Sequence, residues 1–332
     1  MRFMYAWNRF IEKWMPLVTP CCLLIGVFFP DQLSRGLFLV PYIFAFMTFS
    51  GSLNSEFRDV ARVFRHPLPL VATLFIIHFV MPLTASALGH VFFPQNPYLI
   101  TGMVLEFVVP SAIVSFMWVS IYHGSSSFTL SLVLTDTLLA PFLVPLSLRL
   151  FVGSAVQVDT WGMMRELLIM VAIPAVCALP LNQFTDGKYK SALSHRLSPF
   201  GKIALILVVS VNSSKVSPFI KHMTPQLFAV AGTVLLIAAS GYGIGWLGAV
   251  LLRQKRDFII SMTFNSGMRN ISAGAVIAAA YFPPEVMFPV MIGTLFQQVL
   301  AAVYAQLIIR RYGDTQPESD SCPAPEPGSI VD

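Results

Sequence analysis

The sequence predicts an all-α membrane protein in which ten transmembrane helices form two inverted repeats of five. The 332-residue chain is 56% hydrophobic and 11% charged, whereas soluble domains carry about 25% charged residues, and its mean hydropathy is +0.73. Apolar runs recur along nearly its whole length, and several reach the roughly 20 residues that a bilayer crossing needs. Two of these runs are interrupted at corresponding positions in the two halves of the chain.

The expected spans are the apolar runs between the short polar and basic clusters. In chain order they cover residues 14–29, 37–51, 68–88, 98–122, 128–153, 163–181, 200–211, 226–252, 258–281 and 286–310. The fourth run is interrupted at Pro110-Ser111 and the ninth near Gly267, and each is the fourth member of its half (repeats 14–153 and 163–310). Because five is odd, the second half begins on the opposite face of the membrane, which inverts the repeat.

The distribution of basic residues predicts the orientation. The side that holds both termini also carries the basic clusters 58–65, 188–196 and 253–256, whereas the opposite loops carry few Lys or Arg residues. Cytoplasmic loops are enriched in Lys and Arg, so both termini are expected in the cytoplasm, with the protein in a bacterial inner membrane. This pattern accounts for the net charge of +5 better than a nucleic-acid partner does.

The two ends of the chain and the cysteines complete the domain organisation. Residues 1–312 are expected to form the membrane domain, with a retained first span and no cleaved signal peptide. Residues 313–332 are polar, acidic and proline-rich, which predicts a disordered cytoplasmic tail. The four cysteines show neither CxxC spacing nor a Cys/His ligand set, so no metal, cofactor or disulfide framework is expected.

The interruptions point to a transport function. Residues 265–274 read NSGMRNISAG inside an apolar run, and Arg269 alone costs a few kcal/mol at the bilayer centre unless a partner or an aqueous cavity receives it. Broken, polar helices are tolerated at membrane depth where they line a cavity, and matched interruptions mark the binding sites of secondary transporters. The alternative is that Pro110 is a simple kink and Gly267 a packing glycine.

Four stretches carry a resemblance to a known family. They are a basic loop and third span at 59–82, PSAIVSF at 110–116, a fifth span at 130–145 with the core TLLAP at 137–141, and NSGMRN at 265–270. On these motifs the chain, over roughly residues 15–312, resembles the bile acid:sodium symporter family. The resemblance implies a panel domain, a core domain, and discontinuous fourth and ninth spans that cross at the substrate and sodium sites.

The chain departs from this family's pattern in its ninth and third spans. The family's acidic sodium ligand falls on Asn265, its nearby glutamine on Arg269, and the partner glutamine of the third span on His78. A carboxylate is thereby lost and a fixed positive charge is gained, and that charge repels a cation.

The fourth and fifth spans depart in the same direction. The family's serine is kept as Ser115, but the asparagine after it is replaced by Phe116. Of a hydroxyl pair in the fifth span Thr129 is kept, whereas the other position is Val133. Phenylalanine and valine offer no oxygen to sodium, so these exchanges weigh against sodium coupling.

Three ionisable residues lie deep in the expected spans: Glu106, Asp136 and Arg269. We expect Arg269 to supply the positive charge that sodium supplies elsewhere, with Asp136 as its preferred counter-ion and Glu106 as the other candidate. In one mechanism Glu106 or Asp136 carries a coupling proton, and a titrating partner must be an acid or His78 because arginine stays protonated. In the other, the arginine pair is structural and transport is facilitated or exchanges anions.

The expected substrate is a small organic anion, either steroid-like or a simple carboxylate. The helix N-termini after Ser111 and Gly267 present free N–H groups, and a guanidinium suits carboxylate or sulfate. Residues 116–118 either line an apolar wall or face the domain interface. The expected substrate-binding residues are Ser111, Ser115, Phe116, Asn265, Gly267, Arg269 and Asn270. The expected coupling residues are Glu106, Asp136, His78 and Thr129.

Other functions fit the sequence less well. Arsenite permeases of the wider superfamily rely on a cysteine in the fourth span, and none occurs between residues 96 and 122. The positions of His78, Ser115 and Asp136 match no hydrolase spacing, so an enzyme is not expected. A substrate-sensing receptor on the same fold stays open, although the short tail offers no output domain.

Overall fold

The computed structural model describes residues 18–313 except 19, 54–66, 153–155, 157–158 and 184–187. Every regular element in this part of the chain is helical. Seven helices are long and apolar enough to cross a membrane, namely Pro30–Ser52, Pro67–Phe92, Ser126–Val152, Thr160–Ala178, Pro199–Lys221, Pro225–Leu251 and Pro284–Tyr312. The expected all-α membrane class is therefore confirmed. The basic loop 54–66 and the tail 314–332 lie outside the described residues.

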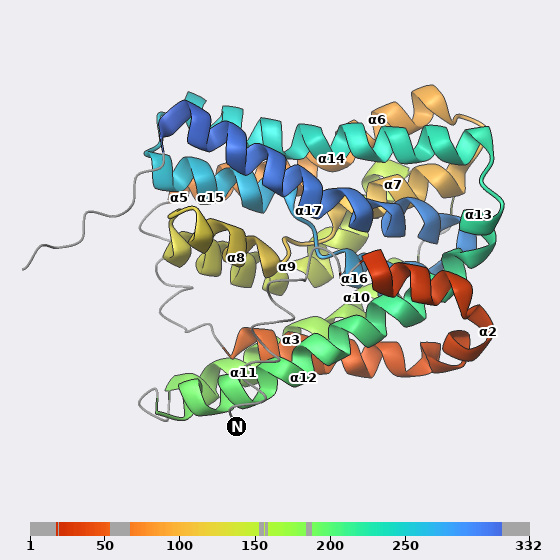
Figure 1. Cartoon of the computed structure of the whole chain (residues 1–332), viewed down its shortest axis with the longest axis horizontal. Coiled ribbons are helices and arrows are strands. Elements are labelled where there is room, and N and C mark those ends of the chain that lie inside the picture. The colour runs from red at the N-terminus through yellow and green to blue at the C-terminus, as the bar shows by residue number, and fades with distance from the viewer. Residues whose placement is uncertain are drawn as a thin grey trace, which may run out of the picture.

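The helices form two groups (Figure 1). The larger group contains α5 (Pro67–Phe75), η3 (Ile76–Val80), α6 (Met81–Phe92), α7 (Pro97–Val108), α14 (Pro225–Leu251), α15 (Arg256–Gly267) and α17 (Pro284–Tyr312). The smaller group contains α2 (Pro30–Leu33), η1 (Ser34–Leu39), α3 (Val40–Ser52), α11 (Ile173–Gln183) and α12 (Lys188–Ser213). Between them lie α8 (Val114–Ile121), α9 (Ser126–Val152), α10 (Thr160–Leu167), η5 (Leu168–Ala172) and α16 (Ile271–Tyr281), while η6 (Ser214–Val216) and α13 (Ser217–Lys221) continue α12.

Both expected interruptions are present. Val109, which precedes Pro110, is extended with φ −62° and ψ 151°, because the proline ring disfavours helical geometry in the preceding residue. At the second interruption, α15 ends at Gly267, and Met268 is extended at φ −103° and ψ 123°. The chain becomes helical again at Ile271, after the N-cap Asn270, whose side chain accepts a hydrogen bond from Ala273 N at 3.3 Å. Each interruption is thus a few extended residues between two short helices.

Other expected spans differ from the structure in length. The run 200–211 is part of a continuous helix from Lys188 to Ser213, because a helix can extend past its apolar stretch into polar residues. The expected second span, 37–51, becomes helical in the α form only at Val40, after the 3-10 turn η1. The third and sixth runs each contain a π-helical segment, at Ile76–Val80 and Leu168–Ala172. Part of the first run, 14–17 and 19, lies outside the described residues.

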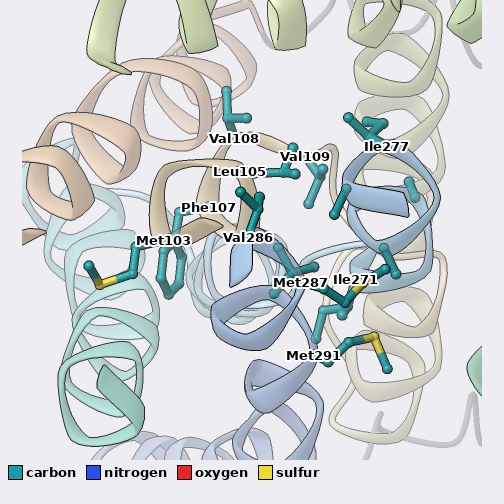
Figure 2. Close-up of a cluster of buried hydrophobic side chains, with 14 of the residues drawn as sticks. Met103, Leu105, Phe107, Val108, Val109, Ile271, Ile277, Val286, Met287 and Met291 are labelled. Carbon is teal, nitrogen blue, oxygen red and sulfur yellow. The ribbon is translucent and has the colours of Figure 1, made fainter. Parts of the chain in front are cut away.

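A buried apolar cluster contains residues of α7 and α16, which lie next to the two interruptions. Met103, Leu105 and Phe107 of α7 belong to one buried cluster with Met287 of α17 and Ile271 of α16, and Figure 2 shows the last two next to each other. Within a bilayer, packing of this kind acts through close van der Waals contact, because lipid tails are as apolar as the side chains. The cluster therefore packs α7, which leads into the first interruption, together with α16, which follows the second.

Candidate functional site

The two interruptions meet at a crossover, which we define as residues 109–113 and 268–270. Ser111 and Arg269 form an isolated antiparallel bridge. Ala112 N donates to Met268 O at 3.2 Å, and Asn270 N donates to Pro110 O at 2.8 Å. Backbone groups released by each break are thereby satisfied by the other break, as buried N–H and C=O groups require. The crossing of the two interrupted helices is held by main-chain bonds.

Asn265 lies at the centre of a closed hydrogen-bond network. Its Oδ1 atom accepts from Ser115 Oγ at 2.7 Å, and its Nδ2 atom donates to Thr129 Oγ1 at 3.0 Å and to Ser261 O at 2.8 Å. Asn265, Ser115 and Thr129 are each 0% exposed. The Nδ2 donor of Asn265 thus points at the hydroxyl oxygen of Thr129. The amide oxygen of Asn265 already accepts a hydrogen bond from Ser115.

Asp136 connects the third span to the crossover. Its Oδ1 atom lies 2.5 Å from His78 Nε2, and its Oδ2 atom accepts from Ser111 N at 2.7 Å. Both side chains are buried. His78 belongs to the π segment η3, and its other ring nitrogen, Nδ1, is buried and has no hydrogen-bond partner in the part of the chain that the structure describes.

Arg269 is held by carbonyl groups and not by an acid. Its Nε atom donates to Phe107 O at 3.2 Å and its Nη1 atom to Asn265 O at 3.3 Å. Its Nη2 atom is buried, and no described residue hydrogen-bonds to it. The expected ion pair with Asp136 is not formed among the described residues; the carboxylate of Asp136 is bonded instead to His78 Nε2 and Ser111 N.

Glu106, the other candidate counter-ion, also stands apart from Arg269. It is 3% exposed, and its Oε2 atom has no hydrogen-bond partner. The carboxyl group packs on Gly293 of α17, where a Cβ atom would overlap it. Glu106 therefore occupies a space that a glycine on the neighbouring helix leaves open.

A cavity of about 650 Å³ lies between the two helix groups and reaches the crossover. Its lining comes mainly from α3, α8, α9, α12, α16 and α17 and is largely apolar. Arg269 and Lys202 are the charged residues among the described lining, which contains no acidic side chain. The volume falls in the range of pockets that take drug-sized ligands, about 300–1,000 Å³.

The cavity separates the expected substrate residues into two sets. Ser111, Phe116, Arg269 and Asn270 line it. Ser115, Asn265 and Gly267 lie beneath the surface with the four expected coupling residues, and none of them belongs to the lining. Gly267 contributes through packing, since a Cβ atom there would overlap the ring of Tyr242.

The residues after Ser115 divide between the cavity and the protein interior. Phe116 and Met117 line the cavity. Trp118 instead stacks on Tyr122 and Phe264, and its Nε1 atom donates to Gln298 Oε1 at 2.9 Å. Of residues 116–118, Phe116 and Met117 therefore contribute to the apolar wall of the cavity.

The lining also includes residues that were not predicted from the sequence, among them Lys202, Asn212, Gln297 and Gln298. Gln297 Oε1 accepts from Arg269 N at 2.8 Å, and both amide atoms of Asn212 are buried without a partner. The sequence contains a signal for the two glutamines, because their adjacent amide side chains interrupt the apolar run 286–310. Asn212 lies at the end of its run and resembled a loop residue.

Comparisons with known proteins agree on one family. The family model described as the sodium bile acid symporter family matches residues 41–223. The chain is 42% identical over 296 residues to the uncharacterized protein YbaS of Bacillus subtilis, which covers 89% of this chain and 97% of that protein. It is 21% identical over 282 residues to the uncharacterized sodium-dependent transporter YocS of the same species (85% and 86%). It is 20% identical over 311 residues to the probable sodium/metabolite cotransporter BASS3 of Arabidopsis thaliana (90% and 69%).

Proposed function

The chain belongs to the sodium bile acid symporter family, and we propose that it is a secondary transporter that carries a small organic anion by alternating access. In this proposal α7–α8 and α15–α16 are the fourth and ninth of ten spans arranged in two inverted repeats. The larger helix group and the crossover form the core domain, and α3, α11 and α12 belong to the panel domain. Both termini are proposed to be cytoplasmic, in a bacterial inner membrane.

One observation carries the choice of substrate. Arg269 lines a cavity whose described lining contains no acidic residue, and one of its amino groups, Nη2, is buried without a hydrogen-bond partner among the described residues. A carboxylate, sulfate or sulfonate in the cavity would complement this positive charge, and it would accept a charge-assisted hydrogen bond once the side chain turned its buried Nη2 group toward the cavity. The apolar walls, which include Phe116 and Met117, would accept a hydrocarbon or steroid body. We therefore favour an amphipathic organic anion over a small inorganic one.

The start of α16 adds the positive end of its helix dipole beside the guanidinium, although most N–H groups of this turn are already hydrogen-bonded. Ala273 N and Gly274 N are used by the Asn270 cap, and Ile271 N donates to Arg269 O at 3.0 Å. Asn270, Ile271 and Ser272 line the cavity. The N-terminus of a helix attracts negative charge, so the anion is proposed to lie between Arg269 and the first turn of α16.

Sodium is not proposed as the coupling ion. Some relatives are named as sodium-dependent or sodium/metabolite transporters, but the acid at the family's sodium position is here Asn265. Its Nδ2 donor is directed at Thr129 Oγ1, where a cation would need a free oxygen. A buried guanidinium nearby adds repulsion.

The test is a thermal-shift screen of the purified full chain against cholate, taurocholate and aliphatic carboxylates as potassium salts, with and without sodium chloride. We expect anions to raise the melting temperature equally in sodium and in choline chloride. Stabilisation that requires sodium would refute the sodium-independent part of the proposal. Failure of every anion to bind, together with no uptake into proteoliposomes, would refute the choice of substrate.

A further inference from the structure

We propose that the His78–Asp136 pair is a proton-binding site whose occupancy is linked to anion binding at Arg269, so that the anion is carried together with H⁺. This inference rests on the proposed function. It adds the identity of the coupling ion and the residue that receives it.

The pair has a vacant position for a proton. Asp136 Oδ1 engages Nε2 of the imidazole, while Nδ1 is buried and has no hydrogen-bond partner among the described residues. A neutral imidazole that donates through Nε2 leaves Nδ1 as an acceptor, and adding a proton there gives an imidazolium beside a carboxylate. Arg269 cannot serve this purpose, because a guanidinium does not release its proton in proteins.

Few other groups compete for this role. The elements packed against η3 are α5, α6, α7, α9 and α14, and α5 carries no titratable side chain. The remaining elements carry His90, Tyr98, Glu106, Asp136, Arg149 and Tyr242. Among these described groups, Asp136 is the one bonded to the imidazole.

A continuous series of contacts joins the proton site to the anion site. Asp136 Oδ2 accepts from Ser111 N, and Ser111 is bridged to Arg269 across the crossover. Ser111 Oγ also donates to Asn265 O at 3.1 Å, the same carbonyl that accepts from Arg269 Nη1. A change of charge on His78 therefore acts on the backbone that positions the guanidinium.

Electrostatics gives the direction of the linkage. Arg269, Asp136, Glu106 and His78 are all buried, and charges attract or repel one another more strongly in a low-dielectric interior than in water. An anion that enters beside Arg269 adds one negative charge, which favours the protonated form of His78. By reciprocity, protonation of His78 must raise the affinity for the anion by the same factor.

Glu106 is the alternative acceptor. Its Oε2 atom is also unpartnered, but no hydrogen bond joins its carboxyl group to the described residues of the crossover, and its side chain packs on Gly293. A proton on Glu106 would therefore lack the direct connection that Asp136 gives to His78. The variants below separate the two residues.

The first experiment counts protons. Binding of potassium taurocholate, cholate and octanoate to the full chain is measured by isothermal titration calorimetry, without sodium, in Tris and in triethanolamine, two cationic buffers with different ionisation enthalpies. We expect uptake of a substantial fraction of a proton, up to about one, per anion bound, falling to near zero in His78→Gln. Glu106→Gln and His90→Gln, whose histidine is exposed on α6, should retain proton uptake.

Each other outcome overturns the inference. Anion binding by the wild type without proton uptake refutes it and leaves the proposed function standing. Proton uptake that persists in His78→Gln, or that is lost only in Glu106→Gln, would mean that the proton binds at a residue other than His78. Failure of the wild type to bind any of the three anions refutes the proposed function and the inference together.

A second experiment needs no variant. Sodium-free proteoliposomes with an alkaline interior are given radiolabelled taurocholate, a strong acid that does not cross lipid in a protonated form. A gradient of one pH unit is expected to drive about tenfold accumulation relative to no gradient, since one unit is a tenfold ratio of proton activity. Protein-free liposomes are the control, and uptake that ignores the gradient contradicts proton coupling.

Discussion

Ser111 and Arg269 face each other in an antiparallel bridge where the two interrupted helices cross. The bonds beside this bridge, Ala112 N to Met268 O and Asn270 N to Pro110 O, are made by the main chain. Side chains on both segments can therefore be exchanged without removing the bonds that hold the crossing. This is consistent with the expectation that the crossing is kept although Arg269 stands where the resemblance implies a glutamine.

Arg269→Gln is expected to weaken anion binding by at least about tenfold, because a hydrogen bond to a charged group contributes about 1.5–3 kcal/mol and 1.4 kcal/mol is tenfold. Arg269→Lys should show a smaller loss, since it keeps the charge but not the planar fork. Calorimetry measures the affinities, with the exposed Arg253→Gln as control.

The stability of the Arg269 variant separates binding from folding. No acid pairs with Arg269 among the described residues, so its removal leaves no unpaired carboxylate. We expect the melting temperature of Arg269→Gln to stay within a few degrees of the wild type. Unchanged anion affinity in a well-folded variant would contradict the role assigned to this guanidinium.

Gly267→Ala should destabilise the fold by about 1–3 kcal/mol, the usual cost of overpacking. The added Cβ would overlap the ring of Tyr242, whereas at Gly232 on the neighbouring helix nothing lies within 4 Å. Gly232→Ala is the matched control and should be neutral or stabilising by up to about 1 kcal/mol, because alanine favours helix. Equal melting temperatures for the two variants would show that Gly267 is not a close-packing position.

Asn265 and Ser115 are expected to be energetically coupled. Asn265→Ala removes partners from the buried hydroxyls of Ser115 and Thr129, which costs about 1–3 kcal/mol for each group left unsatisfied. A double-mutant cycle with Ser115→Ala, followed by unfolding in detergent, should give a coupling energy of about 1 kcal/mol. Strict additivity of the two substitutions would mean that the network contributes nothing.

The architecture was predictable because its signals are local. Apolar run length identified the membrane class, and Pro110 and Gly267 identified both interruptions, since proline and glycine act on the backbone where they stand. The limits of the seventh span were not predictable, because a polar sequence such as 188–198 reads as a loop yet lies in the helix Lys188–Ser213. Hydropathy indicates which residues can enter the membrane and does not indicate where a helix stops.

The partners of buried charges were less predictable than their positions. Glu106, Asp136 and Arg269 were identified as buried ionisable residues, and all three are buried. Asp136 was expected to pair with Arg269 but is bonded to His78 and Ser111 N, because a main-chain amide freed by Pro110 and a ring nitrogen in the π segment are both nearer. Such choices depend on distances of a few ångströms between spans, which residue spacing does not encode.

Phe116 is expected to determine how strongly the hydrocarbon part of the anion is bound. It lines the cavity, and each buried methylene contributes about 0.8 kcal/mol, which is about fourfold in affinity. From butyrate to octanoate, the wild type should therefore gain affinity with each methylene that enters the cavity.

Phe116→Ala should weaken octanoate binding by about tenfold and butyrate binding far less, because the short chain gains little from the wall. Phe228→Ala, whose phenylalanine is exposed on α14, is the control. Calorimetry on the series checks the trend, and an equal loss for both carboxylates would mean that Phe116 shapes the charged end of the site and not its apolar wall.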